Sequence, residues 1–270
     1  MWMIDMIVLI LILIAIYLFM LRGRAGHKKL KELRKWSYAH RGLHDEKYPE
    51  NSMGAFRQAV EAGYGFELDV RLLADGQLAV MHDSSIQRMT GVDKKIEELT
   101  ASQIAGYCLK NTEEKIPLFA DVLKMVDGRV PMIVEIKTDG ENTATVTEAT
   151  CKMLQDYPGL YCVESFDPRC IAYVRKHYPQ FVRGQLAGNS LREKSPVPFL
   201  LRFMLTYQLM NFLVVPDFIA YCYRDRKTLS NFLCRKLWKI QGVSWTLTNI
   251  EQYETAVKEG WIPIFENFRP

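Results

Sequence analysis

The chain has 270 residues, of which 49% are hydrophobic and 24% are charged, with a formal net charge of +4 at pH 7. These proportions are typical of a folded protein and exclude a largely disordered one. From residue 36 onward, 28 Lys and Arg residues face 29 Asp and Glu residues. We therefore expect no nucleic-acid partner, because such a partner calls for a strongly basic surface.

Residues 2–21 form an apolar stretch in which Asp5 is the single charge. About 20 apolar residues are enough to cross a bilayer. A cleaved signal peptide is the alternative, but such a segment starts with basic residues and ends at a small-residue cleavage site. Neither feature is present here, so we predict a retained transmembrane anchor at 2–21.

A basic segment, residues 22–35, follows the predicted anchor. Because basic residues favour the cytoplasmic side of a membrane, a single-pass protein with its main domain facing the cytoplasm is predicted. The segment either lies as a tether on anionic lipid headgroups or only sets the topology. Its basic residues are Arg22, Arg24, Lys28, Lys29, Lys31, Arg34 and Lys35.

The six cysteines show no C-x-x-C pair, and the closest two, Cys162 and Cys170, lack the spacing of a zinc site. We expect all six to be buried free thiols in a reducing compartment.

After residue 35, short apolar runs alternate with helical patterns, which favours a parallel sheet covered by helices. One chain segment of this length, 36–270, suits a single TIM (β/α)8 barrel. Such a barrel has eight strands, and one of nine candidates is extra. We assign that role to 78–81, because the turn signal Asp75-Gly76 makes it a hairpin arm and a small insertion after the second strand. The candidate strands are 36–40, 65–70, 78–81, 131–136, 160–165, 181–185, 217–221, 242–246 and 261–265, and helices are expected at 52–62, 100–106, 118–127, 143–156, 168–178 and 250–259.

Residues 199–215 are almost wholly apolar, with Arg202 as the single charge. A second membrane crossing there would place the last strands on the far side of the bilayer, so that the barrel could not close. The segment is therefore either a buried helix or a helix that dips into the membrane near the active-site mouth.

Two predicted strands carry carboxylates on one face. In the strand at 65–70, Glu67 and Asp69 alternate with apolar residues and so share a face. In the strand at 131–136, Glu135 shares a face with Lys137. Neighbouring carboxylates repel each other unless a cation lies between them, and oxygen ligands suit Mg²⁺ or Ca²⁺. The alternatives are surface acids and a structural Glu–Lys pair.

Two histidines end predicted strands and can transfer protons near neutral pH. Arg41 and Gly42 follow His40, and an arginine fork suits phosphate oxygens. Asp83 follows His82. We expect the other three histidines, at 27, 44 and 177, to be surface residues.

In their order, these motifs resemble the glycerophosphodiester phosphodiesterase family. The resemblance covers about 36–270. The matching segments are His40-Arg41-Gly42, Pro49-Glu50-Asn51-Ser52, Glu67-Leu68-Asp69, His82-Asp83, Glu135-Ile136-Lys137, Arg88 through Gly91, Ile116-Pro117-Leu118, Ser165-Phe166-Asp167-Pro168 and Trp245-Thr246.

The resemblance implies a TIM barrel and a metal-dependent hydrolysis of glycerophosphodiesters to an alcohol and sn-glycerol 3-phosphate. By its motifs, His40 and His82 form the acid–base pair, and Glu67, Asp69 and Glu135 bind Mg²⁺ or Ca²⁺. The phosphate and substrate contacts it implies are Arg41, Lys137, Glu50 and Trp245. The chain departs from the family pattern at its end, where Glu266-Asn267 replaces a Thr-Asp or Thr-Asn pair.

Three other functions compete with this expectation. The predicted anchor motivates a lysophospholipase D-like activity on lysophospholipids held in membrane lipid. A barrel that binds a phosphate ligand without turnover is a second alternative. A phosphatidylinositol phospholipase C is a third, but that family lacks the ordered Glu-Leu-Asp and Glu-Ile-Lys strands.

Overall fold

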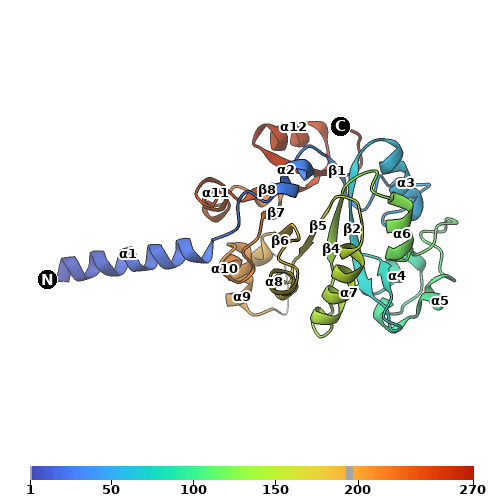
Figure 1. Ribbon diagram of the computed structural model, residues 1–270, viewed down its shortest axis with the longest axis horizontal. Helices are drawn as coiled ribbons and strands as arrows, with labels where there is room; N and C mark the ends of the chain where they lie inside the picture. The colour runs from blue at the N-terminus through green and yellow to red at the C-terminus, as the bar shows by residue number, and fades with distance from the viewer. Residues whose placement is uncertain (1, 193–196) are drawn as a thin grey trace.

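A computed structural model describes residues 2–192 and 197–270 of the protein. Its central feature is a closed barrel of eight parallel strands with helices around it (Figure 1). β1 pairs with both β2 and β9, which closes the sheet. The strands are β1 (Tyr38–Ala39), β2 (Gly65–Leu72), β4 (Met132–Ile136), β5 (Tyr161–Ser165), β6 (Arg183–Ala187), β7 (Phe218–Cys222), β8 (Gln241–Leu247) and β9 (Trp261–Phe265). The predicted TIM barrel is confirmed.

Helices follow the strands and cover the outside of the barrel. The long ones are amphipathic, and their apolar side packs on the sheet. Their bounds are α3 (Met53–Glu61), α6 (Phe119–Val126), α7 (Thr143–Gln155), α8 (Pro168–His177), α9 (Phe199–Thr206), α10 (Asn211–Val214), α11 (Leu229–Lys236) and α12 (Ile250–Lys258), with short 3₁₀ turns η2 (Ser190–Arg192) and η3 (Tyr223–Asp225).

Alternation along the strands decides which side chains enter the barrel. In β4, Met132, Val134 and Ile136 pack outward against the helices, whereas Ile133 lies in the interior cluster. Glu135 is two residues further along the same inward face. In β2 the residues Phe66, Leu68 and Val70 likewise pack outward, which turns the carboxylates between them inward.

The extra strand β3 (Leu78–Val80) pairs antiparallel with β2, as predicted for the segment at 78–81. It opens an insertion that contains α4 (Gln87–Thr90), η1 (Ile96–Glu98) and α5 (Ala101–Ile104). This insertion has its own apolar cluster, in which Ile86, Met89 and Ile96 are fully buried or nearly so. Because the insertion has a core of its own, it is rigid enough to hold a side chain over the end of the barrel.

The N-terminal helix α1 (Trp2–Met20) projects from the barrel and has no buried residue (Figure 1). It is the one helix among the described residues that is long and apolar enough to cross a membrane. The segment that follows is not a free tether. α2 (Lys28–Leu33) buries Leu30 and Leu33 in the interior cluster of the barrel, and Arg24 pairs with the buried Asp217 at 2.6 Å.

The apolar segment 199–215 differs from the prediction of one buried helix. It forms two short helices, α9 and α10, and of the α9 residues Thr206 alone is buried. Phe199 and Leu200 are 70% and 68% exposed. Of the two alternatives for this segment, the buried helix is therefore wrong, because the segment holds enough apolar residues for all sides of a helix, whereas the barrel covers one side.

The expectation for the cysteines was wrong in part. All six are free thiols, but Cys108 is exposed and Cys222 is half-buried. Cys108 lies in the small insertion, whose core is too thin to cover it.

Candidate active site

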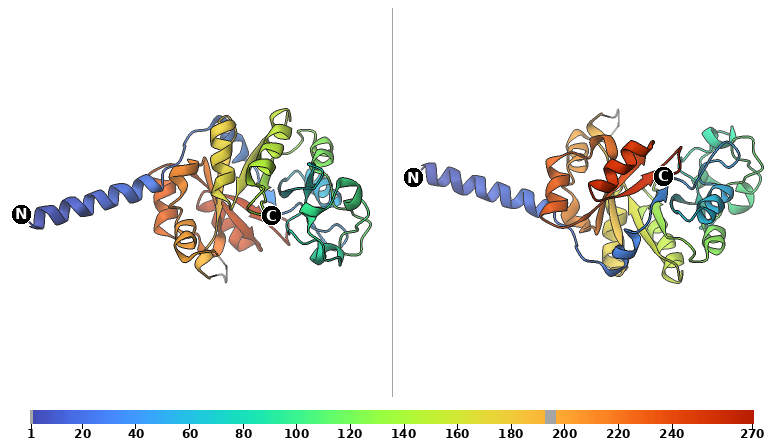
Figure 2. Two further views of the ribbon diagram at one scale, coloured as in Figure 1. Left: turned by 90° about the horizontal axis from the view of Figure 1, so that it is seen from below. Right: turned by 90° about the horizontal axis from the view of Figure 1, so that it is seen from above.

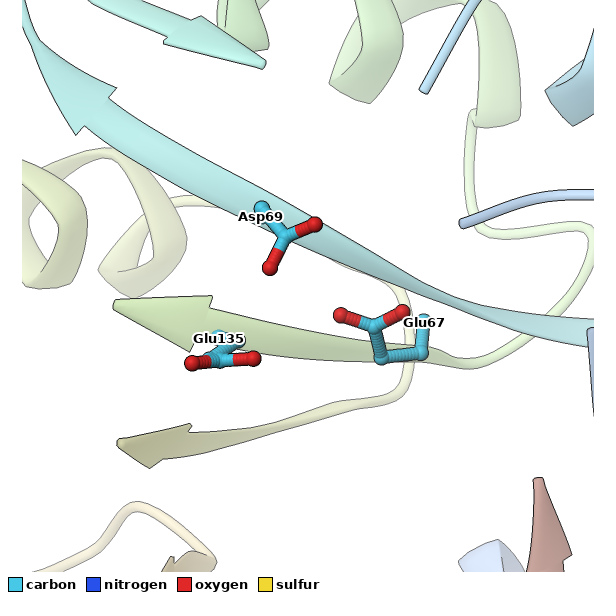
Figure 3. Close-up of side chains that lie close together, drawn as sticks. All are labelled: Glu67, Asp69 and Glu135. Carbon is cyan, nitrogen blue, oxygen red and sulfur yellow. The ribbon is translucent and has the colours of Figure 1, made fainter. Parts of the chain in front are cut away.

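Three carboxylates meet inside the barrel, from the middle of β2 and the carboxyl end of β4 (Figure 3). Glu67, Asp69 and Glu135 each offer an oxygen within 4.8 Å of the other two, and all three residues are buried. Asp69 and Glu135 are neighbours in the register of β2 and β4. The two strands that the sequence singled out thus bring their carboxylates together.

Two cations lie beside this cluster. The Lys137 ammonium is 2.7 Å from Glu135 Oε1 and 3.2 Å from Asp69 Oδ1. Arg41 Nε is 3.5 Å from Asp69 Oδ2, and the Arg41 backbone N–H donates to Glu67 Oε2 at 2.9 Å. Two positive side chains therefore face three carboxylates.

The pKa values of the cluster show that its charge is not balanced. Burial raises the pKa of Glu67 well above its ordinary value, and the charges of Asp69 and Glu135 raise it further. Burial also raises the pKa of Glu135, to about 7. For Asp69 burial acts in the same direction, but the charges of Lys137, His82 and Arg41 together outweigh it and hold the pKa below its ordinary value.

These residues fit a divalent cation. Glu67 Oε1 is buried and has no hydrogen-bond partner among residues 2–192 and 197–270. A cation between the three carboxylates would give this oxygen a partner and remove the repulsion that raises two of the pKa values. A purely oxygen ligand set is the kind that Mg²⁺ and Ca²⁺ prefer.

His40 lies at the edge of the carboxylate cluster, with Nε2 3.9 Å from Glu67 Oε2. Its Nδ1 is 3.1 Å from Glu266 Oε1, and His44 Nε2 lies 3.0 Å from the same oxygen. A carboxylate can only accept, so both imidazoles donate, and the pKa of Glu266 is lowered by these bonds. This bond occupies Nδ1 and leaves Nε2 as the ring atom on the side of the cluster.

His82 is held from the insertion, after β3. Its Nδ1 donates to Asp83 Oδ1 at 2.7 Å, which again leaves Nε2 as the acceptor of the neutral ring. Burial lowers the pKa of His82, although the nearby Asp69 opposes that shift. The ring is therefore neutral at pH 7 and able to take up a proton.

Glu50 connects the two histidine loops. Its Oε1 accepts from Arg41 Nη1 and from Arg88 Nη2, each at 2.7 Å, and Arg88 Nε reaches Asp83 Oδ2 at 2.5 Å. Burial alone would raise the pKa of Glu50, but the bonds from Arg88 and Arg41 lower it to about 2. Glu50 is thus joined to the segments that carry His40 and His82 through these two arginines.

A cavity of about 50 Å³ lies between these groups, and its lining includes His40, His82 and Lys137. Trp245 and Phe166 form one wall, with their rings edge to face at 5.7 Å. A larger hollow of about 880 Å³ lies between α6 and the insertion, away from both histidines. The small cavity is the one that brings His40 and His82 together with Glu67 and Glu135.

Three residues of the site were missed or misplaced from the sequence. His44 was expected at the surface, but its bond to Glu266 places it beside His40. Glu164 of β5 is a further buried carboxylate that lines the cavity, and it lies opposite Glu135 in the strand register. The sequence offered one signal for Glu164: it lies two positions after Cys162 in the same strand and so shares its inward face. Asn51 was matched only as part of the segment Pro49-Glu50-Asn51-Ser52, yet its side chain donates to Asp69 Oδ2 at 2.8 Å, whereas Ser52 caps α3.

Comparisons with known proteins place this chain in a family. The profile of the Glycerophosphoryl diester phosphodiesterase family matches residues 40–219. A glycerophosphodiester phosphodiesterase of Caldanaerobacter subterraneus subsp. tengcongensis is 28% identical over 82% of this chain and 89% of its own length. Human glycerophosphodiester phosphodiesterase 1 is 34% identical over 51% of this chain and 44% of its own.

Solved structures support the fold. An Oleispira antarctica phosphodiesterase in complex with the product sn-glycerol-3-phosphate superposes with a TM-score of 0.73. The identity is 16%, over 90% of this chain and 95% of that one. A Thermotoga maritima glycerophosphodiester phosphodiesterase has a TM-score of 0.65 at 24% identity, over 85% of this chain and 93% of its own.

Proposed function

Because the chain belongs to the glycerophosphoryl diester phosphodiesterase family, we propose that it hydrolyses glycerophosphodiesters to an alcohol and sn-glycerol 3-phosphate. The observation that carries the proposal is the buried cluster of Glu67, Asp69 and Glu135 with two histidines facing it. Family membership also favours an enzyme over a barrel that only binds its ligand.

The proposed metal is Mg²⁺ or Ca²⁺, held by Glu67, Asp69 and Glu135. When bound, this cation supplies Lewis-acid stabilisation of the negative charge that develops on the phosphoryl oxygens. Arg41 and Lys137, which lie beside the same carboxylates, would add positive charge for the phosphate. Arg41 suits this role because Glu50 holds one side of its guanidinium.

The two histidines carry the proton transfers. One histidine, with its Nε2 unprotonated, accepts the proton of the attacking oxygen as that oxygen bonds to phosphorus. The other, in its doubly protonated form, donates its Nε2 proton to the alcohol oxygen as the bond of that oxygen to phosphorus breaks. Glu266 orients His40 and Asp83 orients His82, each through Nδ1. Trp245 and Phe166 would contact the part of the substrate beyond the phosphate.

The histidine pair is tested by His40→Ala and His82→Ala in the full-length protein, with His177→Ala as an exposed control. We expect kcat on glycerophosphocholine to fall at least about 100-fold in the first two variants, with circular dichroism unchanged. The control should keep the parent rate. A folded His40 or His82 variant with nearly the parent rate would remove that residue from the mechanism.

We further propose that α1 is a retained single-pass anchor with the barrel on the cytoplasmic side. Leu21, directly after α1, is fully buried beside Ile219 and Ile240, and Trp238 Nε1 donates to Leu18 O at 3.0 Å. Cleavage of a signal peptide near this point would open that apolar cluster to water. The basic residues after α1 support the orientation.

The anchor favours a second substrate class, lysophospholipids, for a lysophospholipase D-like reaction at the same site. A soluble diester gives no reason to hold the enzyme at a bilayer, whereas an acylated one lies there. Rates of the full-length enzyme in liposomes on lysophosphatidylcholine and glycerophosphocholine decide between them. A preference for the soluble diester would leave this second proposal without support.

A further inference from the structure

The helices around the exit of α1 present large apolar side chains to solvent. Beyond α1, the described residues include eleven exposed large hydrophobic side chains, and eight of these lie on α9, α10 and α11 or at the C-cap of α11. Phe199 and Leu200 of α9 and Phe232 of α11 are 70%, 68% and 57% exposed. We refer to the exposed apolar residues of these three helices as the exit face. A face of this kind marks an interaction site.

The same three helices hold the end of α1. Tyr17 and Leu21 pack in one cluster with Met204 of α9 and Leu233 of α11. The rings of Phe19 and Phe212 lie 5.9 Å apart. Figures 1 and 2 show α9, α10 and α11 as the part of the domain nearest to α1, with the insertion at the opposite end. The exit face is thus continuous with the surface of the apolar helix.

Basic residues accompany the apolar ones. Lys236 and Lys239 are exposed at the end of α11, beside the exposed Leu237, and the Arg22 guanidinium lies 4.9 Å from the Phe19 ring centre. Lysine and arginine place their aliphatic stems on an apolar surface while the charge stays at the level of lipid headgroups. Leu and Phe flanked by such residues are typical of helices that lie in the membrane interface.

We propose that the exit face lies in the boundary between headgroups and acyl chains of the bilayer that α1 spans. The barrel then contacts the membrane directly and is not attached to it through a flexible linker alone. This inference rests on the proposed retention of α1. It is independent of the reaction, because none of the residues of the exit face lines the catalytic cavity.

The docked position would bring lipid to the rim of the site. α9 follows the loop that leaves β6 at the carboxyl end of the barrel, and Arg202 Nε donates to Ser190 O of that loop at 2.9 Å. At the start of the loop, Gly188 lies next to the Trp245 ring of the cavity. A monoacyl phosphodiester could thus present its phosphate to the site while its chain stays in the bilayer.

The test is a depth measurement on the full chain in nanodiscs of phosphatidylcholine with phosphatidylglycerol. Cys108 and Cys222, the two thiols that are not buried, are changed to serine, and one nitroxide is attached in turn at Leu200→Cys, Phe232→Cys or Val257→Cys. Val257 is the matched control, since it is an apolar residue of α12, outside the exit face, that is 47% exposed. Collision rates with oxygen and with a water-soluble nickel chelate are compared by electron paramagnetic resonance.

We expect a higher ratio of oxygen to nickel collisions at 200 and 232 than at 257. Equal ratios at all three positions would overturn the proposal. So would dipolar broadening between labels at 200, which would indicate a second copy on this face, or an intact mass that lacks residues 1–21. The same samples are assayed on glycerophosphocholine. Lipid contact without turnover would contradict the proposed function and leave the docking in place.

Discussion

The metal-free protein should lose stability as the pH rises, and Glu135→Gln should reduce that loss. Burial raises the pKa of Glu135 from 4.5 to about 7 in the folded chain. The folded state therefore favours the protonated carboxyl, so the stability is fully present below pH 4.5 and is lost as the pH rises through 7. This difference in pKa corresponds to a loss of about 3 kcal/mol in the free energy of unfolding.

The assay is urea unfolding of the full-length protein in detergent with EDTA, at several values between pH 5 and pH 8. The free energy of unfolding of the parent should fall more steeply with pH than that of Glu135→Gln, by up to about 3 kcal/mol over the range. Glu61→Gln, at an exposed position of α3, is the matched control and should follow the parent.

Saturating Mg²⁺ or Ca²⁺ should remove most of this loss in the parent, because the cation binds the ionised carboxylates. The same cation should raise the free energy of unfolding of Glu135→Gln by a smaller amount. Identical slopes for the parent and Glu135→Gln in EDTA would refute the reasoning, since the buried carboxyl would then not be protonated near neutral pH.

Three further predictions concern single contacts. Glu67→Gln should raise the metal concentration for half-maximal activity about 10-fold or more, because it removes a ligand charge; an unchanged metal titration would exclude this ligand. Glu266→Gln should lower kcat at least about 10-fold and move the pH profile, while leaving KM nearly unchanged, because it weakens the bond that orients His40; an unmoved profile would leave Glu266 with a structural role. Arg24→Ala should lower the free energy of unfolding by about 3 kcal/mol in urea, because the buried Asp217 then keeps its charge without its partner; a change below about 1 kcal/mol would show that the docking of residues 22–35 is weak.

The barrel could be predicted because its signals are local. Each inward or outward position follows from alternation within one strand, and Glu67, Asp69 and Glu135 stand out as carboxylates between apolar neighbours. Parallel pairing then brings the ends of β2 and β4 together without further information. For the same reason the hairpin arm β3 could be read from one turn signal and a short strand.

The contacts that were missed join distant parts of the chain. The Glu266 carboxylate lies after β9, yet it accepts from His40 and His44 after β1, and only the closure of the barrel makes them neighbours. Arg24 reaches Asp217 across 193 positions. The exposure of α9 likewise depends on which side of the helix the barrel covers. The amino-acid composition of the segment does not specify that side.

The most direct test of the central claim is turnover of glycerophosphocholine by the purified full-length protein, with EDTA, Mg²⁺ or Ca²⁺. The account predicts release of sn-glycerol 3-phosphate that EDTA abolishes and one of the cations restores, and that Glu67→Gln greatly weakens at low metal concentration. Equal turnover with EDTA and with added metal would contradict the role assigned to Glu67, Asp69 and Glu135.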